Sequence, residues 1–145
     1  MNITDFCRIW LKAPMSNPYD WSSVNETSFF YLGWNSPENL DFKNRMVNVC
    51  ASTDEAVAKS ATQQLVSKMA RERTKLFEAT KNSKAIYYVL RVKQNPESDS
   101  NWSITAKPRP MSKETVVLKI DNLNFHDNGS VSADIIDRIA AKDIN

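Results

Sequence analysis

Polar and positively charged residues recur along one face of a predicted helix, at a spacing that suits contact with phosphate groups. Separations of four, three and four residues keep side chains on one side of a helix. The residues at these positions are Gln64, Lys68, Arg71 and Lys75. The strand-like segment that follows contributes Tyr87, Arg91 and Lys93, and a later hairpin contributes Lys107 and Arg109. Because aromatic rings stack on bases and cations contact phosphates, this pattern predicts a polyanion-binding surface with nucleic acid as its ligand.

The same helix face also has an ordinary explanation. A surface helix keeps one face in water, and Lys and Arg are good helix formers. Glu72 falls near the middle of the apolar stripe of this helix. Either the helix bends there or Glu72 pairs with Lys68 or Lys75, and both alternatives are compatible with the sequence.

The N-terminal third of the chain is rich in aromatic residues, with eight between Phe6 and Trp34. Consecutive residues of a strand point to opposite faces, so the run FFYLGW cannot direct every ring inward. Exposed Trp and Tyr are typical of protein interfaces. The predicted partner-binding residues are Trp21, Tyr19, Phe30 and Trp34. Trp21 is the strongest candidate, and packing of its ring back onto the core is the alternative.

Catalytic chemistry has little support in the residue types present. The chain has one histidine, His126, so a multi-histidine metal site is excluded. An EF-hand aligned on Gly129 would need a glutamate where Ile135 stands, and Asp121 lacks the second carboxylate and the lysine of a nuclease strand. Only two glycines occur, whereas backbone cradles for phosphate use glycine. We therefore expect no metal site, no cofactor and no enzymatic activity.

Cys7 and Cys50 lie far apart in the sequence and lack the spacing of a metal or redox motif. We interpret them as reduced core residues, with a disulfide as the alternative. The sequence shows neither an export signal nor an apolar run long enough to span a bilayer, which predicts a cytoplasmic protein without membrane contact.

Hydrophobic periodicity predicts the elements of the first half of the chain. Residues 4–14 fit a short helix with Thr4 as its cap, and alternation in part also fits a strand. Residues 27–34 and 45–51 are rich in strand formers, and residues 36–44 begin with helix-start residues. The clearest prediction is one long helix from Ser52 to about Lys81, with Val57, Ala61, Leu65, Met69 and Leu76 on its apolar stripe.

Three strand-like runs follow, at residues 85–93, 102–107 and 115–120, and predict an antiparallel meander. Residues 121–130 read as a loop, and residues 132–142 as a helix with Ile135, Ile136 and Ile139 on its apolar face. With 145 residues, of which 41% are hydrophobic and 25% charged, one folded domain over residues 1–145 is expected. The predicted fold is α+β, with an antiparallel sheet of four to five strands packed against one long central helix and a C-terminal helix. A split βαββ arrangement is the main variant.

A binding function fits these observations better than catalysis. The formal net charge is only +2, with a basic middle, residues 53–113, between two mildly acidic ends. A near-neutral chain with exposed aromatic residues predicts a non-catalytic protein-binding factor, such as an adaptor, an assembly factor or an inhibitor. A homodimer and a phage or mobile-element origin belong to the same expectation. Nucleic-acid binding through residues 64–84 and the adjacent strand is the alternative, and a metal-dependent enzyme ranks last.

Overall fold

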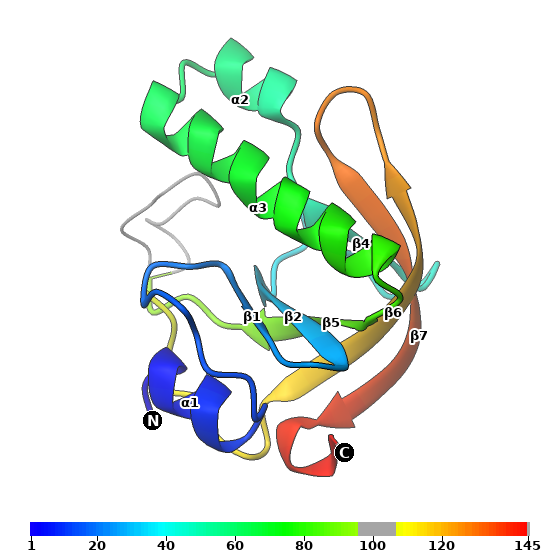
Figure 1. The fold of residues 1–145 in the computed structure, drawn as a ribbon. Helices are drawn as coiled ribbons and strands as arrows, with labels where there is room; N and C mark the ends of the chain where they lie inside the picture. Colours follow the sequence, from blue (N-terminus) through cyan, green and yellow to red (C-terminus); the bar gives the residue numbers. More distant parts are fainter. Residues whose placement is uncertain (96–106, 145) are drawn as a thin grey trace.

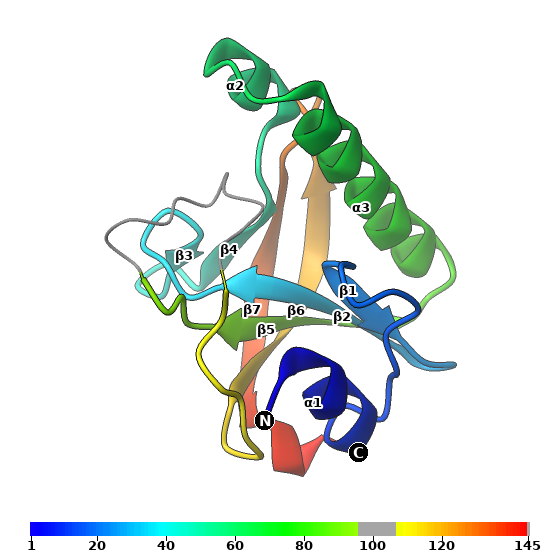
Figure 2. The same cartoon turned by 90° about the vertical axis from the view of Figure 1, so that its left-hand side faces the viewer.

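The protein is built on one seven-stranded mixed sheet (Figures 1 and 2). The computed structural model describes residues 1–95 and 107–144. The strands are β1 (Ser22–Val24), β2 (Ser28–Trp34), β3 (Leu40–Asp41), β4 (Met46–Cys50), β5 (Ala85–Arg91), β6 (Val116–Phe125) and β7 (Val131–Ala140). Their order is β1-β2-β5-β6-β7-β4-β3. The helices are α1 (Ile3–Ile9), α2 (Thr53–Ala58) and α3 (Gln63–Lys81), and a 3-10 turn covers Ala141–Asp143.

This architecture corrects the predicted sheet of four to five antiparallel strands. β2 and β5 pair in parallel, in register from Ser28 opposite Ala85 to Trp34 opposite Arg91, and the other strand pairs are antiparallel. The chain between β2 and β5 forms β3 and β4 at the far edge of the sheet and returns through α2 and α3. A return of this kind brings the next strand back in the same direction, so the pair is parallel.

The predicted C-terminal helix is wrong, because residues 131–140 form β7. β7 pairs with β6 over most of its length and with β4 on its other side. Val131 and Ala133 alternate inward, and three isoleucines follow. The Cβ branching of valine and isoleucine favours a strand over a helix. Pairing with β6 on one side and β4 on the other supplies hydrogen-bond partners to the backbone of β7. The segment expected as a loop, residues 121–130, instead contains the end of β6 and a short turn.

The predicted long helix is two helices separated by a break. Ser52 caps α2 as expected, since its Oγ accepts from the Glu55 amide at 3.1 Å. Ser60 then takes a left-handed conformation with φ of 61°, and the Thr62 hydroxyl caps α3 by accepting from the Leu65 amide at 3.2 Å. The break turns Val57 outward, with 62% of its surface exposed.

Other elements agree with the sequence to different degrees. The strands predicted at residues 27–34, 45–51, 85–93 and 115–120 are confirmed as β2, β4, β5 and β6. Residues 4–14 do contain a helix, but Asn2 caps it in place of Thr4. Residues 36–44 form a turn and the short strand β3, so the helix predicted there is wrong. Most of the strand predicted at residues 102–107 lies outside the described residues.

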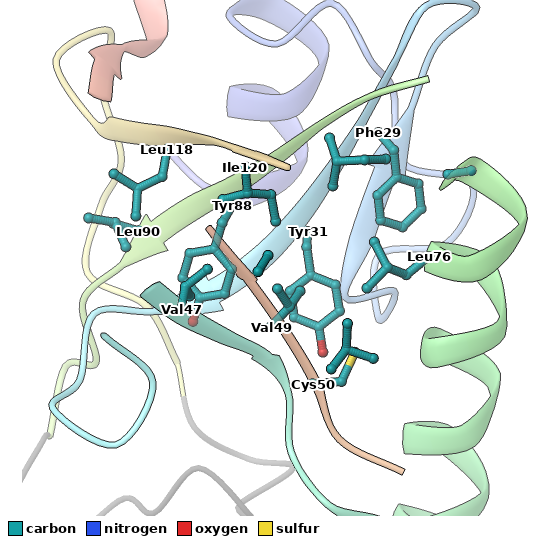
Figure 3. Packing of buried hydrophobic residues seen from close by; sticks show 14 residues of the cluster. Phe29, Tyr31, Val47, Val49, Cys50, Leu76, Tyr88, Leu90, Leu118 and Ile120 are labelled. Carbon is teal, nitrogen blue, oxygen red and sulfur yellow. The ribbon is translucent and has the colours of Figure 1, made fainter. Parts of the chain in front are cut away.

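Two apolar layers cover the two faces of the sheet. α3 packs on one face, over a core that includes Tyr31, Leu76 and Tyr88 (Figure 3). α1 and the 3-10 turn pack on the other face, around Phe6 and Phe30. Figure 2 shows α3 and α1 on opposite sides of β2 and β5. Among the described residues, no helix combines the length and the apolar character that crossing a bilayer requires.

Candidate binding site

A pocket of about 360 Å³ lies where the parallel strands β2 and β5 end. Ligands of sheets with parallel strands commonly bind beyond the carboxyl ends of those strands. Three arginines line the pocket, and we call it the arginine pocket. Its lining residues are Asn35, Phe42, Leu90, Arg91, Val92, Arg109, Pro110, Met111, Glu114, Thr115, Val116 and Arg138.

The wall formed by residues 109–116 is fixed to the sheet by its backbone. The Arg109 amide donates to the Val92 carbonyl at 2.7 Å, and the Thr115 carbonyl accepts from the Ala141 amide at 2.9 Å. Met111 anchors the middle of this wall, because only 4% of its surface is exposed. The backbone that carries these side chains is therefore held in place before a ligand arrives.

Arg91 lies at the end of β5 and carries a positive charge that has no acidic partner among the described residues. Its Nε donates to the Gly33 carbonyl at 3.3 Å, and Nη2 donates to the Leu32 carbonyl. The guanidinium carbon lies 4.0 Å from the Trp34 ring centroid. Burial lowers the pKa of Arg91 to about 10, so the group stays protonated at neutral pH. Carbonyl dipoles and a ring face orient this charge but do not neutralise it.

Arg109 and Arg138 are exposed at the same pocket, and the structure gives neither guanidinium a hydrogen bond or ion pair within the described ranges. The acidic residue of the lining is Glu114, and Lys142 already pairs with it at 2.8 Å. That hydrogen bond lowers the pKa of Glu114. The two exposed guanidinium groups are thus available to a ligand.

Positive charge gathers around this end of the sheet. Seven Lys or Arg but only three Asp or Glu occur in residues 91–93, 107–116 and 137–144. In the whole chain the numbers are nearly equal, with nineteen Lys or Arg and seventeen Asp or Glu. The rest of the chain is therefore slightly acidic. A protein with this distribution attracts anions to the pocket end in spite of a net charge of only +2.

Apolar side chains form much of the remaining surface of the arginine pocket. Leu90 is 6% exposed and belongs to the core beneath α3, on the side away from Leu76 (Figure 3). Phe42 presents a ring that is 48% exposed. A pocket with apolar walls and a few convergent polar groups is the usual form of a small-ligand site. The pocket suits a ligand that combines an anionic group with an apolar or planar body.

The predicted partner-binding aromatic residues do not form one surface. Phe30 is fully buried and stacks on Tyr87 with a centroid distance of 5.0 Å, so it must be removed from the partner-binding set. Trp34 is half-buried beneath Arg91 at the arginine pocket. Trp21 is also half-buried and packs with the cluster at the start of α3, in line with the alternative stated for it. Tyr19 remains as the exposed member, at 79%.

Two cations of the predicted basic band are occupied by acids of the same protein. Glu72 is 2% exposed, and its Oε1 lies 3.2 Å from Lys75 Nζ and 3.7 Å from Lys68 Nζ. Lys75 also pairs with Asp20 at 3.2 Å. Of the two alternatives for Glu72, pairing is therefore the one that the structure shows. Arg71 is exposed, and within the described residues its side chain makes no hydrogen bond or ion pair.

The other half of the predicted polyanion surface faces away from α3. Tyr87 belongs to the layer beneath α1, whereas Leu76 of α3 packs in the opposite layer. Gln64 and Arg71 lie exposed on α3. Because Tyr87 and the α3 residues lie on different faces of the sheet, they cannot contact one ligand together. Arg91 and Arg109 of the predicted surface line the arginine pocket. Lys93 lies two residues beyond Arg91, with Nζ 5.6 Å from the Trp34 ring.

Sequence reasoning missed Arg138 entirely. Residues 132–142 were expected to form a helix, whereas Arg138 pairs with Leu118 across β6 and β7. Arg109 was recognised as a cation, but its approach to Arg138 depends on that pairing. The flanking prolines of Arg109 are the local feature that indicates an extended wall rather than a helix.

The residues considered for catalysis lie elsewhere. His126 is at the tip of the β6–β7 hairpin, where its Nε2 lies 2.8 Å from Ser132 Oγ. Asp121 is exposed within β6. Cys7 and Cys50 are free and buried, in different layers of the core. In the part of the chain that the structure describes, no group of three or more His, Cys, Asp or Glu is placed to hold a metal ion.

No protein-family model, curated protein or solved structure matches this chain.

Proposed function

We propose that the protein is a non-catalytic binding protein that holds an anionic ligand in the arginine pocket. The observation that carries this proposal is the pair of exposed arginines, Arg109 and Arg138, without acidic partners, beside the unneutralised Arg91. A planar guanidinium donates in a fork that matches carboxylate and phosphate oxygens. Holding such groups on a fixed wall reduces the entropy lost when a ligand binds.

The proposal places the binding surface at the pocket end of the sheet and not on α3. Lys68 and Lys75 already stabilise the buried carboxylate of Glu72, and moving them to a ligand would leave that charge buried and unpaired. Arg109 and Arg138 carry no such cost. An anion therefore gains more from the arginine pocket than from α3.

A titration with two acidic polymers tests this function. Polyglutamate and polyphosphate are titrated by calorimetry into wild type, into Arg109→Gln/Arg138→Gln and into Arg71→Gln/Lys81→Gln. The second double variant is a matched control, because it removes the same charge from exposed positions on α3. Loss of two charge-assisted contacts should weaken binding about a hundredfold in the pocket variant. Equal weakening in both variants would show attraction by net charge alone, and absence of binding by wild type would reject the proposal.

Protein binding is the second candidate, favoured by Tyr19. This ring is 79% exposed, while the two residues after it are tied to α3. Asp20 pairs with Lys75, and the Trp21 amide donates to Glu72 Oε1 at 3.4 Å. A rigidly held exposed aromatic residue is a typical anchor of a protein interface. The homodimer form of this proposal predicts a dimer in sedimentation equilibrium that dissociates in Tyr19→Ser, and a monomer at every concentration would exclude it.

A further inference from the structure

We infer that the ligand of the arginine pocket is a phosphorylated nucleoside unit, either a free nucleotide or one nucleotide within a single strand. This inference rests on the proposed anion binding and specifies its chemistry. The two sources share one recognition problem, which is to hold a phosphate and a planar base at a short distance from each other.

The phosphate is assigned to Arg109 and Arg138. These side chains come from the wall after β5 and from β7, so they approach the pocket from different segments. A phosphate has enough oxygens to accept from two guanidinium forks, whereas a single carboxylate has two oxygens and suits one fork. Arg91 adds positive potential from its fixed place on Trp34. Three guanidinium groups around one pocket match a phosphate better than a lone carboxylate.

The base is assigned to the apolar side of the pocket. Phe42 offers a ring that is 48% exposed, and Leu90 and Met111 form buried surface in the same lining. Aromatic rings stack on bases of any sequence because every base has a π face. The volume of about 360 Å³ is near the lower end of the usual range of ligand pockets, about 300 to 1,000 Å³, which accommodates one nucleotide unit but not a long folded ligand.

Asn35 supplies a polar group for the edge of the base. The backbone N–H of Asn35 donates to the Arg91 carbonyl at 2.7 Å, and this bond fixes the residue at the pocket. Within residues 1–95 and 107–144 its side-chain amide has no hydrogen-bond partner. An amide that can donate and accept together is suited to a base edge. Recognition by side chains also removes the need for a glycine-rich cradle, which the two glycines of this chain could not provide.

Calorimetry with the fragments of a nucleotide tests each assignment. The probes are AMP, adenosine, ribose 5-phosphate and a single-stranded decamer of adenylate. AMP should bind more tightly than either adenosine or ribose 5-phosphate, since each lacks one of the two contacts. Phe42→Ala should weaken AMP about tenfold and leave ribose 5-phosphate unchanged, because stacking contributes about 1 to 3 kcal/mol per base. Arg109→Gln/Arg138→Gln should weaken the binding of AMP and of ribose 5-phosphate about a hundredfold.

The decamer distinguishes the two sources of the nucleotide. A single strand is identified if the decamer binds more tightly than AMP and the plot of log K against log salt has a slope of about −0.7 for each phosphate contacted. Binding of AMP that exceeds binding of the decamer identifies a free nucleotide. If ribose 5-phosphate binds as tightly as AMP, or Phe42→Ala weakens both equally, the base assignment is overturned. Binding of polyglutamate without binding of AMP overturns this inference and leaves the proposed function intact, whereas binding of no probe overturns both.

Discussion

The Arg91 guanidinium carbon lies 4.0 Å from the centre of the Trp34 ring, across the ends of the parallel strands β5 and β2. Two backbone carbonyls, those of Gly33 and Leu32, accept from the same guanidinium. The charge is therefore held in a fixed position without being cancelled. This arrangement makes the end of the sheet positive and is the structural basis of the arginine pocket.

Arg91→Lys should destabilise the protein. A lysine cannot reproduce the planar stack on Trp34 together with two directed hydrogen bonds, so we expect a loss of about 1 to 3 kcal/mol in the free energy of unfolding. Urea unfolding monitored by circular dichroism measures the loss. Arg109→Lys is the control, since that side chain makes no such contacts in the described structure and should change stability by less than about 0.5 kcal/mol. Equal effects of the two substitutions would mean that the Arg91 contacts carry no stability.

Gly33→Ala should be strongly destabilising. A Cβ at Gly33 would lie 1.9 Å from Cζ of Tyr88, whose ring is fully buried and whose hydroxyl accepts from the Trp34 amide at 3.1 Å. Overpacking of this kind costs about 1 to 3 kcal/mol and occasionally more. Tyr88→Leu removes the atoms that would clash, so the added methyl should cost much less in that background. A double-mutant cycle by urea unfolding measures this coupling, and additive effects would contradict the close approach.

Leu76→Ala should cost about 2 to 5 kcal/mol, because the side chain is fully buried between α3 and the sheet. Leu65→Ala should lower stability within the same range, although its cluster at the start of α3 is smaller. Val57→Ala is the control, since 62% of Val57 is exposed and the expected change is within about 0.5 kcal/mol. A large loss in Val57→Ala, or none in Leu76→Ala, would show that α3 packs differently.

The free energy of unfolding should decrease as pH rises above about 9, because of the two buried thiols. Burial raises the pKa of Cys7 from 9.0 to about 11 and that of Cys50 from 9.0 to about 12. The unfolded chain loses these protons near 9.0 while the folded chain retains them, so the unfolded state binds fewer protons and unfolding becomes easier as pH rises. Each thiol contributes a slope of at most about 1.4 kcal/mol per pH unit.

The measurement is the difference in unfolding free energy between wild type and Cys7→Ala/Cys50→Ala. This difference should be constant up to about pH 8 and should shift in favour of the variant between pH 9 and 10.5, as follows from the thiol pKa values. Comparison with the variant cancels the contributions that groups other than the two thiols make to the pH dependence. A difference that stays constant over the whole range would contradict the burial of both thiols.

Local features of the sequence predicted the elements that depend on local interactions. Ser52 caps a helix through contacts within three residues, and the run around Phe29 and Phe30 favours a strand wherever it packs. The parallel pairing of β2 and β5 depends on how a return of some fifty residues is routed, which no local pattern encodes. The strand β7 was missed because three isoleucines fit either period when their partner strand is unknown.

The candidate site was predictable only in part for the same reason. Arg91 and Lys93 were selected because aromatic residues and cations are interleaved in the strand-like run of residues 85–93. Their association with Arg138 requires the pairing of β6 with β7, and Phe42 joins them from the turn after β3. The cations of α3 formed the more regular pattern, yet the buried Glu72 occupies two of them. Charge spacing alone does not distinguish a cation that binds a ligand from one that stabilises the fold.

The arginine pocket is tested most directly by observing the arginine side chains while a ligand binds. In a spectrum of the protein with nitrogen-15 label, the Nε–Hε signals of Arg109 and Arg138 should shift saturably on titration with AMP, with amide shifts at Val92 and Thr115 of the same lining. The Arg71 signal on α3 should stay in place. Saturable shifts at Arg71 with unchanged signals of Arg109 and Arg138 would contradict the arginine pocket as the binding site.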